Sequence, residues 1–292
     1  MKKENSAKAS LILAMVIFGT IGIFRKYIPL SSGLVACARG ILGVVFLLVF
    51  TKIKKIKMDK EAIRKHLLIL LVSGGFIGLN WVLLFESYRY TSVAVATLCY
   101  YMAPIFVMLI SPVLLKEKLT VKKIVCVMAA LIGMIFVSGV LDGGISDISE
   151  LKGVLFGLGA AALYASVVMM NQKLREVPTY DKTIMQLGSA AVVLVPYILL
   201  AENVGAVELT PLIVIMLIVV GVVHTGIAYA LYFGSMNDLK AQTVALFSYI
   251  DPIVAIILSA LFLKEPMTLH SAIGAVLVLG ATMISELPEK KK

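Results

Sequence analysis

The 292-residue chain is poor in charge and in cysteine, and it lacks a nucleotide-binding motif. Charged residues make up 15% of it, whereas soluble domains contain about 25%, so an ordinary soluble domain is excluded. The three cysteines, Cys37, Cys99 and Cys126, are far apart and have no metal-ligand spacing, which predicts neither a disulfide nor a metal site. Without a G-x-x-x-x-G-K-S/T sequence the chain has no ATP-binding loop, and we expect no cofactor.

The residue sets of membrane-embedded hydrolases are missing as well. An intramembrane aspartyl protease needs two facing carboxylates, yet Asp251 is the only Asp in the middle of an apolar run. No G-x-S-G sequence supplies a rhomboid-like nucleophile, and His224 has no partner at metal-binding spacing. The sequence therefore predicts that the protein is not an enzyme.

Long apolar runs fill most of the chain, which is 60% hydrophobic with a mean hydropathy of +1.00. A helix needs about 20 apolar residues to cross a bilayer. Ten stretches reach or approach that length: 8–26, 33–51, 67–88, 92–115, 121–140, 152–172, 183–200, 211–233, 241–262 and 268–286. Because a backbone in lipid must satisfy its own hydrogen bonds, these stretches should be helices. We predict an all-α integral membrane protein with ten transmembrane helices.

Basic residues divide unevenly between the two sides that ten crossings create. With the N-terminus in the cytoplasm, 21 of the 27 Lys and Arg residues face the cytoplasm and five face outward. Arg39 is the one that remains within the membrane. This bias follows the positive-inside rule, and an even number of crossings places both termini in the cytoplasm. The net charge of +10 thus reflects topology, so we expect a lipid bilayer and no nucleic acid as partner.

The second half of the chain repeats the first. A shift of 148 positions aligns residues 78–131 with 226–279 without a gap, and 14 of the 54 aligned pairs are identical. We therefore predict two five-helix repeats, 1–145 and 146–292, within one integrated transmembrane domain. An odd number of helices per repeat inverts the second copy in the membrane, which is the usual plan of a secondary transporter.

Both copies carry a proline inside a span. Pro104 and Pro252 occupy matching positions in spans 4 and 9, where proline removes a helical hydrogen bond and frees the carbonyl four residues earlier. These prolines either break the helices to shape and gate a pathway or only bend them for packing. The preceding residue is Ala103 in the first copy and Asp251 in the second, which marks Asp251 as a functional candidate.

Deep polar and aromatic residues are the candidates for a substrate pathway, because ionisable groups are costly inside a membrane. The ionisable candidates are Arg39, His224 and Asp251; the alternatives are a static Arg39–Asp251 pair and a structural histidine. The other candidates, which packing would explain equally well, are Asn80, Trp81, Tyr100, Tyr101, Tyr229 and Tyr249. Such a lining suits a small zwitterionic or amphipathic solute.

The repeat also contains Lys116-Glu117 and Lys264-Glu265, at the ends of spans 4 and 9. We expect these pairs to terminate helices and to form interfacial contacts.

Taken together, the ten spans, the two repeats, the tyrosine-to-proline segment of span 4, the Lys-Glu-x-x-Thr junctions and the acidic residue before Pro252 resemble the EamA-type transporters of the drug/metabolite transporter superfamily. The resemblance covers essentially the whole chain. It implies a basket-like bundle of two inverted five-helix repeats in a bacterial plasma (inner) membrane. Arg39 matches a commonly basic position of that family, and Asp251 stands where the family commonly has Glu.

These observations predict a secondary, non-ATP transporter that exports small metabolites such as amino acids by alternating access. A buried carboxylate or imidazole could carry protons, with Asp251 first and His224 second, although a uniporter would need neither. The rival hypotheses are a multidrug exporter of cationic compounds and a non-transporting membrane scaffold.

Overall fold

The computed structural model describes residues 2–114, 120–137, 148–202, 209–236, 238–239, 244 and 247–287. Every regular element among those residues is helical, so the all-α prediction is confirmed for this part of the chain. The predicted boundary between repeats at residues 145 and 146, and the Lys116-Glu117 pair, lie outside the described residues.

The first half of the chain contains α1 (Lys2–Tyr27), α2 (Ser32–Ile53), the short α3 (Lys60–Lys65), α4 (Leu67–Tyr90), α5 (Val93–Tyr100), α6 (Ala103–Leu114) and α7 (Val121–Val137). The second half contains α8 (Ile148–Asn171), the 3-10 turn η2 (Gln172–Leu174), α9 (Thr179–Ala201), α10 (Pro211–Ile218), the π-helix η4 (Val219–Ile227), α11 (Ala228–Met236), α13 (Ile250–Phe262) and α14 (Leu269–Glu286).

Among the described residues, seven helical segments are long and apolar enough to cross a membrane by length and composition. They are Lys3–Tyr27, Ser32–Ile53, Leu67–Tyr90, Val93–Ile110, Ile148–Leu174, Thr179–Ala201 and Pro211–Ser235. Two shorter apolar helices, Ile250–Phe262 and Leu269–Ser285, lie in the predicted spans 9 and 10, and α7 has 17 residues in the predicted span 5. The described residues therefore support seven spans and these shorter helices, where the sequence predicts ten.

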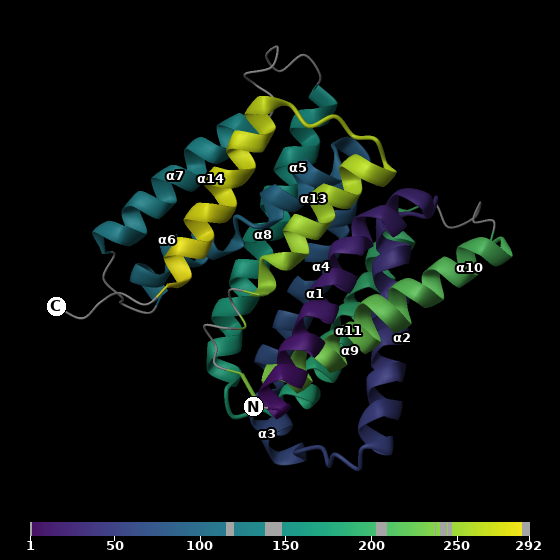
Figure 1. The fold of residues 1–292 in the computed structure, drawn as a ribbon. Helices are drawn as coiled ribbons and strands as arrows, with labels where there is room; N and C mark the ends of the chain where they lie inside the picture. Colours follow the sequence, from purple (N-terminus) through teal and green to yellow (C-terminus); the bar gives the residue numbers. More distant parts are fainter. Residues whose placement is uncertain are drawn as a thin grey trace.

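Helix α4 lies in the middle of the bundle and packs mainly on α8 and α9, while α1 packs on α11 and α13 (Figure 1). Helices α7 and α14 form a separate pair at one side. Glycines permit this pair to approach closely: a Cβ on Gly274 would lie 2.6 Å from the Gly133 carbonyl oxygen. Close packing through small residues is typical of helices in membranes.

Both prolines lie where a helix begins. Helix α5 ends at Tyr100, and α6 starts at Ala103 with Pro104 in its first turn. Helix α13 starts at Ile250 with Pro252 in its first turn, after a turn at Tyr249. A proline in the first turn is tolerated because the carbonyl that would accept from its missing N–H, four residues earlier, lies before the helix begins. A helix thus begins one residue before Pro104 and two residues before Pro252.

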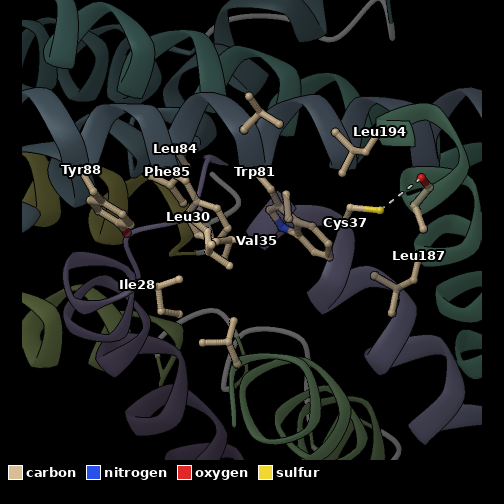
Figure 2. Close-up of a cluster of buried hydrophobic side chains, with 14 of the residues drawn as sticks. Ile28, Leu30, Val35, Cys37, Trp81, Leu84, Phe85, Tyr88, Leu187 and Leu194 are labelled. Atoms are coloured by element: carbon tan, nitrogen blue, oxygen red, sulfur yellow. Dashed lines mark hydrogen bonds between the residues drawn. The ribbon is translucent and has the colours of Figure 1, made fainter. Parts of the chain in front are cut away.

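The main hydrophobic core lies between α4, α2 and α9. Figure 2 shows Trp81, Phe85 and Tyr88 projecting from α4 toward Val35 and Ile28, with Leu187 and Leu194 to the right, near Cys37. Cys37 Sγ lies 3.7 Å from the Ala191 carbonyl oxygen, and the three cysteines are all buried and free.

Candidate functional site

Arg39 is buried in the middle of the bundle. Only 4% of it is exposed, its guanidinium carbon lies 3.9 Å from the Trp81 ring centroid, and its Nε donates a hydrogen bond to Thr225 Oγ1 at 3.1 Å. Glycine brings α2 this close to η4, because a Cβ on Gly43 would lie 2.5 Å from Thr225 Cγ2. A cation on a tryptophan face in a dry site is stabilised by up to about 2 kcal/mol or more.

No carboxylate lies within 4 Å of the Arg39 guanidinium among the residues that the structure describes. Removing a charge from water costs several kcal/mol, and a ring face with one hydroxyl recovers only part of that cost. Phenol groups of Tyr229, Tyr100 and Tyr88 lie within electrostatic reach of the guanidinium. Arg39 is thus a buried cation in an aromatic, uncharged environment.

Asp251 lies in the first turn of α13 and is half-buried. The Tyr101 hydroxyl lies 2.9 Å from Asp251 Oδ2 and 3.2 Å from the Ser248 carbonyl oxygen. This is the carbonyl that Pro252 leaves without its helical donor. Tyr101 belongs to the α5–α6 interruption, so the two proline-associated breaks contact each other through one tyrosine.

The sequence leaves open a static ion pair between Arg39 and Asp251, and the structure does not contain it. Each has its own neutral partners: Trp81 and Thr225 for Arg39, and Tyr101 for Asp251. Both charges lie within electrostatic reach of Tyr88. The site therefore presents a buried cation and a carboxylate that do not neutralise each other directly.

Tyrosine rings connect the α5–α6 interruption with its neighbours. Tyr101 lies 6.3 Å from Tyr100 and 6.2 Å from Tyr249, measured between ring centroids, and Tyr100 lies 5.5 Å from Tyr164. Tyr229 on α11 packs instead against Phe18 at 5.4 Å and Phe233 at 5.6 Å. Tyr164 also belongs to this group, although its helix α8 has a small residue at every fourth position, a pattern typical of helix packing: Gly153, Gly157, Ala161 and Ala165.

Asn80 joins two helices. Its Nδ2 donates a hydrogen bond to the Ala160 carbonyl oxygen on α8 at 2.5 Å, and only 1% of the residue is exposed. The same side chain lies beside the Tyr100 hydroxyl. Asn80 therefore fixes α8 on α4 and orients Tyr100, and it touches the candidate site through that tyrosine.

His224 lies in the π-helix η4, a type of segment often found at functional sites. Its Nε2 is 2.8 Å from Thr20 Oγ1 and its Nδ1 is 3.3 Å from the Val219 carbonyl oxygen, while Thr20 Oγ1 donates to the Ile17 carbonyl at 2.7 Å. These three contacts need three protons, whereas a neutral imidazole and one hydroxyl supply two. A protonated imidazole would complete the set.

Two glutamates close the end of the bundle that the sequence places outside, which we call the predicted outer end. Glu265 accepts a hydrogen bond from the Val93 backbone at 2.8 Å and lies 3.6 Å from Lys26 Nζ. Glu202 accepts from the Gly33 backbone at 2.9 Å and from the Ser31 hydroxyl. Each carboxylate from the second half thus caps the N-terminus of a helix from the first half.

The sequence anticipated an interfacial contact for Glu265 but missed Glu202. Glu265 pairs with Lys26 and not with its neighbour Lys264, whose backbone turns with a φ of 52° just after α13. Glu202 has no counterpart in the repeat and follows an apolar run, so nothing in its pattern distinguishes it from an ordinary end-of-span acid.

Comparison with known families gives two matches within this chain. The profile of the EamA-like transporter family matches residues 6–139 and again residues 151–286. The two matched stretches are separated by residues 140–150.

Similar proteins cover nearly the same length. The uncharacterized transporter YxxF of Bacillus subtilis strain 168 is 28% identical over 97% of this chain and 90% of its own. The uncharacterized transporter YoaV of the same organism is 30% identical over 85% of this chain and 84% of its own. An uncharacterized transporter of Archaeoglobus fulgidus is 25% identical over 95% of both chains. A solved structure covers 96% of both chains with a TM-score of 0.67 at 18% identity, which is a likeness of fold.

Proposed function

Since the chain belongs to the EamA-like transporter family, we propose that this membrane transporter exports small metabolites such as amino acids by a secondary, alternating-access mechanism. The absence of an ATP-binding loop from the sequence supports a secondary mechanism. The proposal includes ten crossings, a location in a bacterial plasma membrane and both termini in the cytoplasm, which the positive-inside bias supports.

One observation carries the choice of solute. Arg39 and Asp251 are opposite charges in the interior, and neither has an ion partner within 4 Å among the described residues. A solute with a carboxylate and an ammonium group would give Arg39 and Asp251 each a counter-ion. The same two contacts would compensate the solute's own charges for the loss of water. The surrounding tyrosines and Trp81 supply apolar faces and hydroxyls. This combination favours a zwitterion such as an amino acid.

The repeat supports alternating access. We propose two inverted five-helix repeats, and the two separate family matches are consistent with them. Tyr101 joins the break before Pro104 to the carbonyl and carboxylate at the break near Pro252. In this mechanism the two interruptions act as hinges, and the Tyr101 contacts change when access passes from one side of the membrane to the other.

Energy for export would come from protons, carried by Asp251 first and by His224 second. Asp251 changes its charge on protonation beside the solute site and has a neutral partner in Tyr101. His224 has a hydrogen-bond set that is one proton short when the ring is neutral. Both can therefore take up a proton without breaking an existing ion pair.

A second candidate function is the export of cationic compounds, because Asp251 has no cationic partner among the described residues. The two functions differ in Arg39, which would repel a cation and would attract a zwitterion's carboxylate. They can be separated by comparing solutes that differ only in charge.

The test is flux into proteoliposomes containing the purified protein. A panel of amino acids would be compared with the matching amines, which lack the carboxylate, and the matching carboxylic acids, which lack the amine. We expect amino-acid flux well above that of protein-free liposomes and weaker flux of both analogues. Faster flux of the amine would favour the cation exporter, and no flux of any member would leave the non-transporting scaffold.

A further inference from the structure

The predicted outer end contains a cavity of about 480 Å³ that no part of the mechanism above uses. Its lining includes three basic residues, Arg25, Lys26 and Arg89, together with Pro29, Ser31 and Tyr88. No carboxylate is among the described residues that line it. Two of the bases already have acidic partners: Lys26 lies 3.6 Å from Glu265, and Arg89 lies 2.9 Å from Glu86.

Arg25 is the base that has no acidic partner within 4 Å among the residues that the structure describes. It is 5% exposed, its Nη1 donates to the Ile28 carbonyl at 2.8 Å and its Nη2 donates to the Ser32 hydroxyl at 2.9 Å. Its Nε is buried without a hydrogen-bond partner. Holding the 28–32 turn accounts for the two Nη groups and leaves the Nε without an acceptor, while Glu86 and Glu202 lie within electrostatic reach of the guanidinium but form no ion pair with it within 4 Å. An unpaired buried donor is unfavourable, so a ligand that accepts from it would be stabilised.

An aromatic face of α4 connects this cavity with Arg39. Trp81, Phe85 and Tyr88 are spaced four and three residues apart and project from one side of the helix (Figure 2). The guanidinium carbon of Arg25 lies 5.8 Å from the Phe85 ring centroid, and that of Arg39 lies 5.6 Å from the same centroid. The two buried cations are thus neighbours of one phenyl ring, and the face ends at Tyr88 in the cavity wall.

We propose that this cavity is a second binding site, which takes a carboxylate-bearing solute between Arg39 and the outside. Arg25 donates hydrogen bonds to the carboxylate of the departing solute, and Lys26 and Arg89, each of which also contacts a glutamate, contribute to the potential along the cavity wall. The inference rests on the proposed function for the identity of the solute. The anion site itself rests on the cavity, the buried Arg25 and the unpaired Nε.

Thiol labelling tests the site without requiring transport. Pro29 is exposed at the cavity wall, and Tyr27 is 57% exposed and is not part of the lining. The P29C and Y27C variants would be labelled in phosphatidylcholine nanodiscs with an anionic and a cationic methanethiosulfonate reagent. The unsubstituted protein is the blank, because its three cysteines are buried. The probe ligand is acetate, exchanged for chloride at constant ionic strength.

For each variant, the labelling rate with the anionic reagent is divided by the rate with the cationic reagent. We expect this ratio at P29C to exceed the ratio at Y27C by at least about fivefold. Adding Arg89→Gln to P29C should lower the ratio. Acetate should slow the anionic reagent at P29C and leave Y27C unchanged. Arg25→Gln should abolish this protection. If R25Q does not fold, Arg25→Lys should keep the rate ratio and weaken the protection, because the lysine retains charge but loses the guanidinium Nε.

Equal ratios at the two positions, or no protection by acetate, would overturn the proposal. A lipid phosphate is the competing source of an anion. If nanodiscs that contain phosphatidylglycerol protect P29C while acetate does not, the cavity is a lipid headgroup site and the solute site is refuted. If no solute of the proteoliposome panel is transported, the proposed function is refuted, but the labelling result at P29C still stands. Failure of the proposed function and failure of the anion site are therefore distinguishable.

Discussion

The stacking of Arg39 on Trp81 makes a specific prediction at the residue scale. Trp81→Ala removes the ring face that lies 3.9 Å from the guanidinium, and Trp81→Phe keeps a smaller one. We expect the KM for solute to rise from wild type to W81F to W81A, by about tenfold for W81A if about 1.4 kcal/mol of cation–π stabilisation is lost. Phe156→Ala is the control, because the Phe156 ring packs on Tyr90. Equal KM values in W81A and F156A would contradict this role.

Asp251 and Ala103 offer a matched comparison, since they occupy the same position in the two repeats. Asp251→Asn removes the charge, and Ala103→Asn places the same amide at the mirrored site. We expect D251N to reduce flux at least about tenfold and A103N much less, because only Asp251 is a candidate charge partner of the solute. Tyr101→Phe removes the 2.9 Å hydrogen bond to Asp251, and its flux should lie between those of D251N and A103N. Equal and mild effects in D251N and A103N would show that the asymmetry has no function.

Residue types within apolar runs identify Arg39, His224 and Asp251 as candidates, because a charge or imidazole is costly there. Their partners are harder to foresee. The Arg39–Trp81 stack, the Tyr101–Asp251 bond and the Thr20–His224 contact each join residues from different helices. Hydropathy reports whether a residue is buried, whereas the identity of its neighbour depends on how the helices are rotated and packed.

At the scale of elements, the two proline breaks should act in opposite directions. Pro104→Ala and Pro252→Ala each restore a helical N–H and should straighten one interruption. Because the repeats are expected to be inverted, one variant should favour access from the cytoplasm and the other access from outside. To measure the accessible side, Tyr249→Cys is added to each proline variant, and the thiol is labelled from each face of the membrane in turn. The same labelling pattern in both variants would contradict the hinge role.

The α7–α14 pair provides a stability test with an internal control. A Cβ on Gly274 would lie 2.6 Å from the Gly133 carbonyl oxygen, while Gly280 on the same helix has nothing within 4 Å. Gly274→Ala should therefore lower the thermal midpoint in detergent, and Gly280→Ala should leave it unchanged or raise it, since Ala is the better helix former. Equal midpoints for the two variants would show that the close approach does not contribute to stability.

Sequence patterns predict the helices and the proline breaks but not the π-helix. Apolar runs and proline chemistry act locally, so span positions and interruptions follow from short segments. The π-helix η4 places the Val219 and Val220 carbonyls opposite His224 and Thr225 five residues later. Its residues are ordinary for a membrane helix. The glycines of η4 allow close packing, because Gly221 lies against Leu42 and Gly226 against Phe46 of α2. The sequence does not show that α2 is the helix they contact.

At the scale of the whole molecule, proton coupling predicts a response to an imposed pH gradient. If Asp251 carries the proton, a proteoliposome pH gradient should drive solute accumulation in wild type, and D251N should equilibrate its solute without accumulation. Glu176→Gln is the control. Contacts with Lys65 and then His66 lower the pKa of the Glu176 carboxylate, so its charge is lost only as pH falls through that lowered value. Flux that ignores the gradient would leave a uniporter.

The repeat is the whole-molecule feature that the sequence reveals most directly. The offset of 148 positions, the paired prolines and the Ala103–Asp251 difference are all visible without coordinates. The contact between the two breaks through Tyr101, and the capping of first-half helices by Glu202 and Glu265, are not visible in this way. They arise where the two halves meet, and alignment of the halves contains no information on that interface.

The most direct test of the central claim is the solute selectivity of the R39Q and D251N variants, measured as flux in proteoliposomes without an ion gradient. An amino acid, its matching amine and its matching carboxylic acid would be compared for each variant. If Arg39 binds the carboxylate and Asp251 the ammonium group, R39Q should lose preference for the amino acid over the amine. D251N should likewise lose preference for the amino acid over the acid. A uniform decrease for all three solutes in both variants would contradict the account.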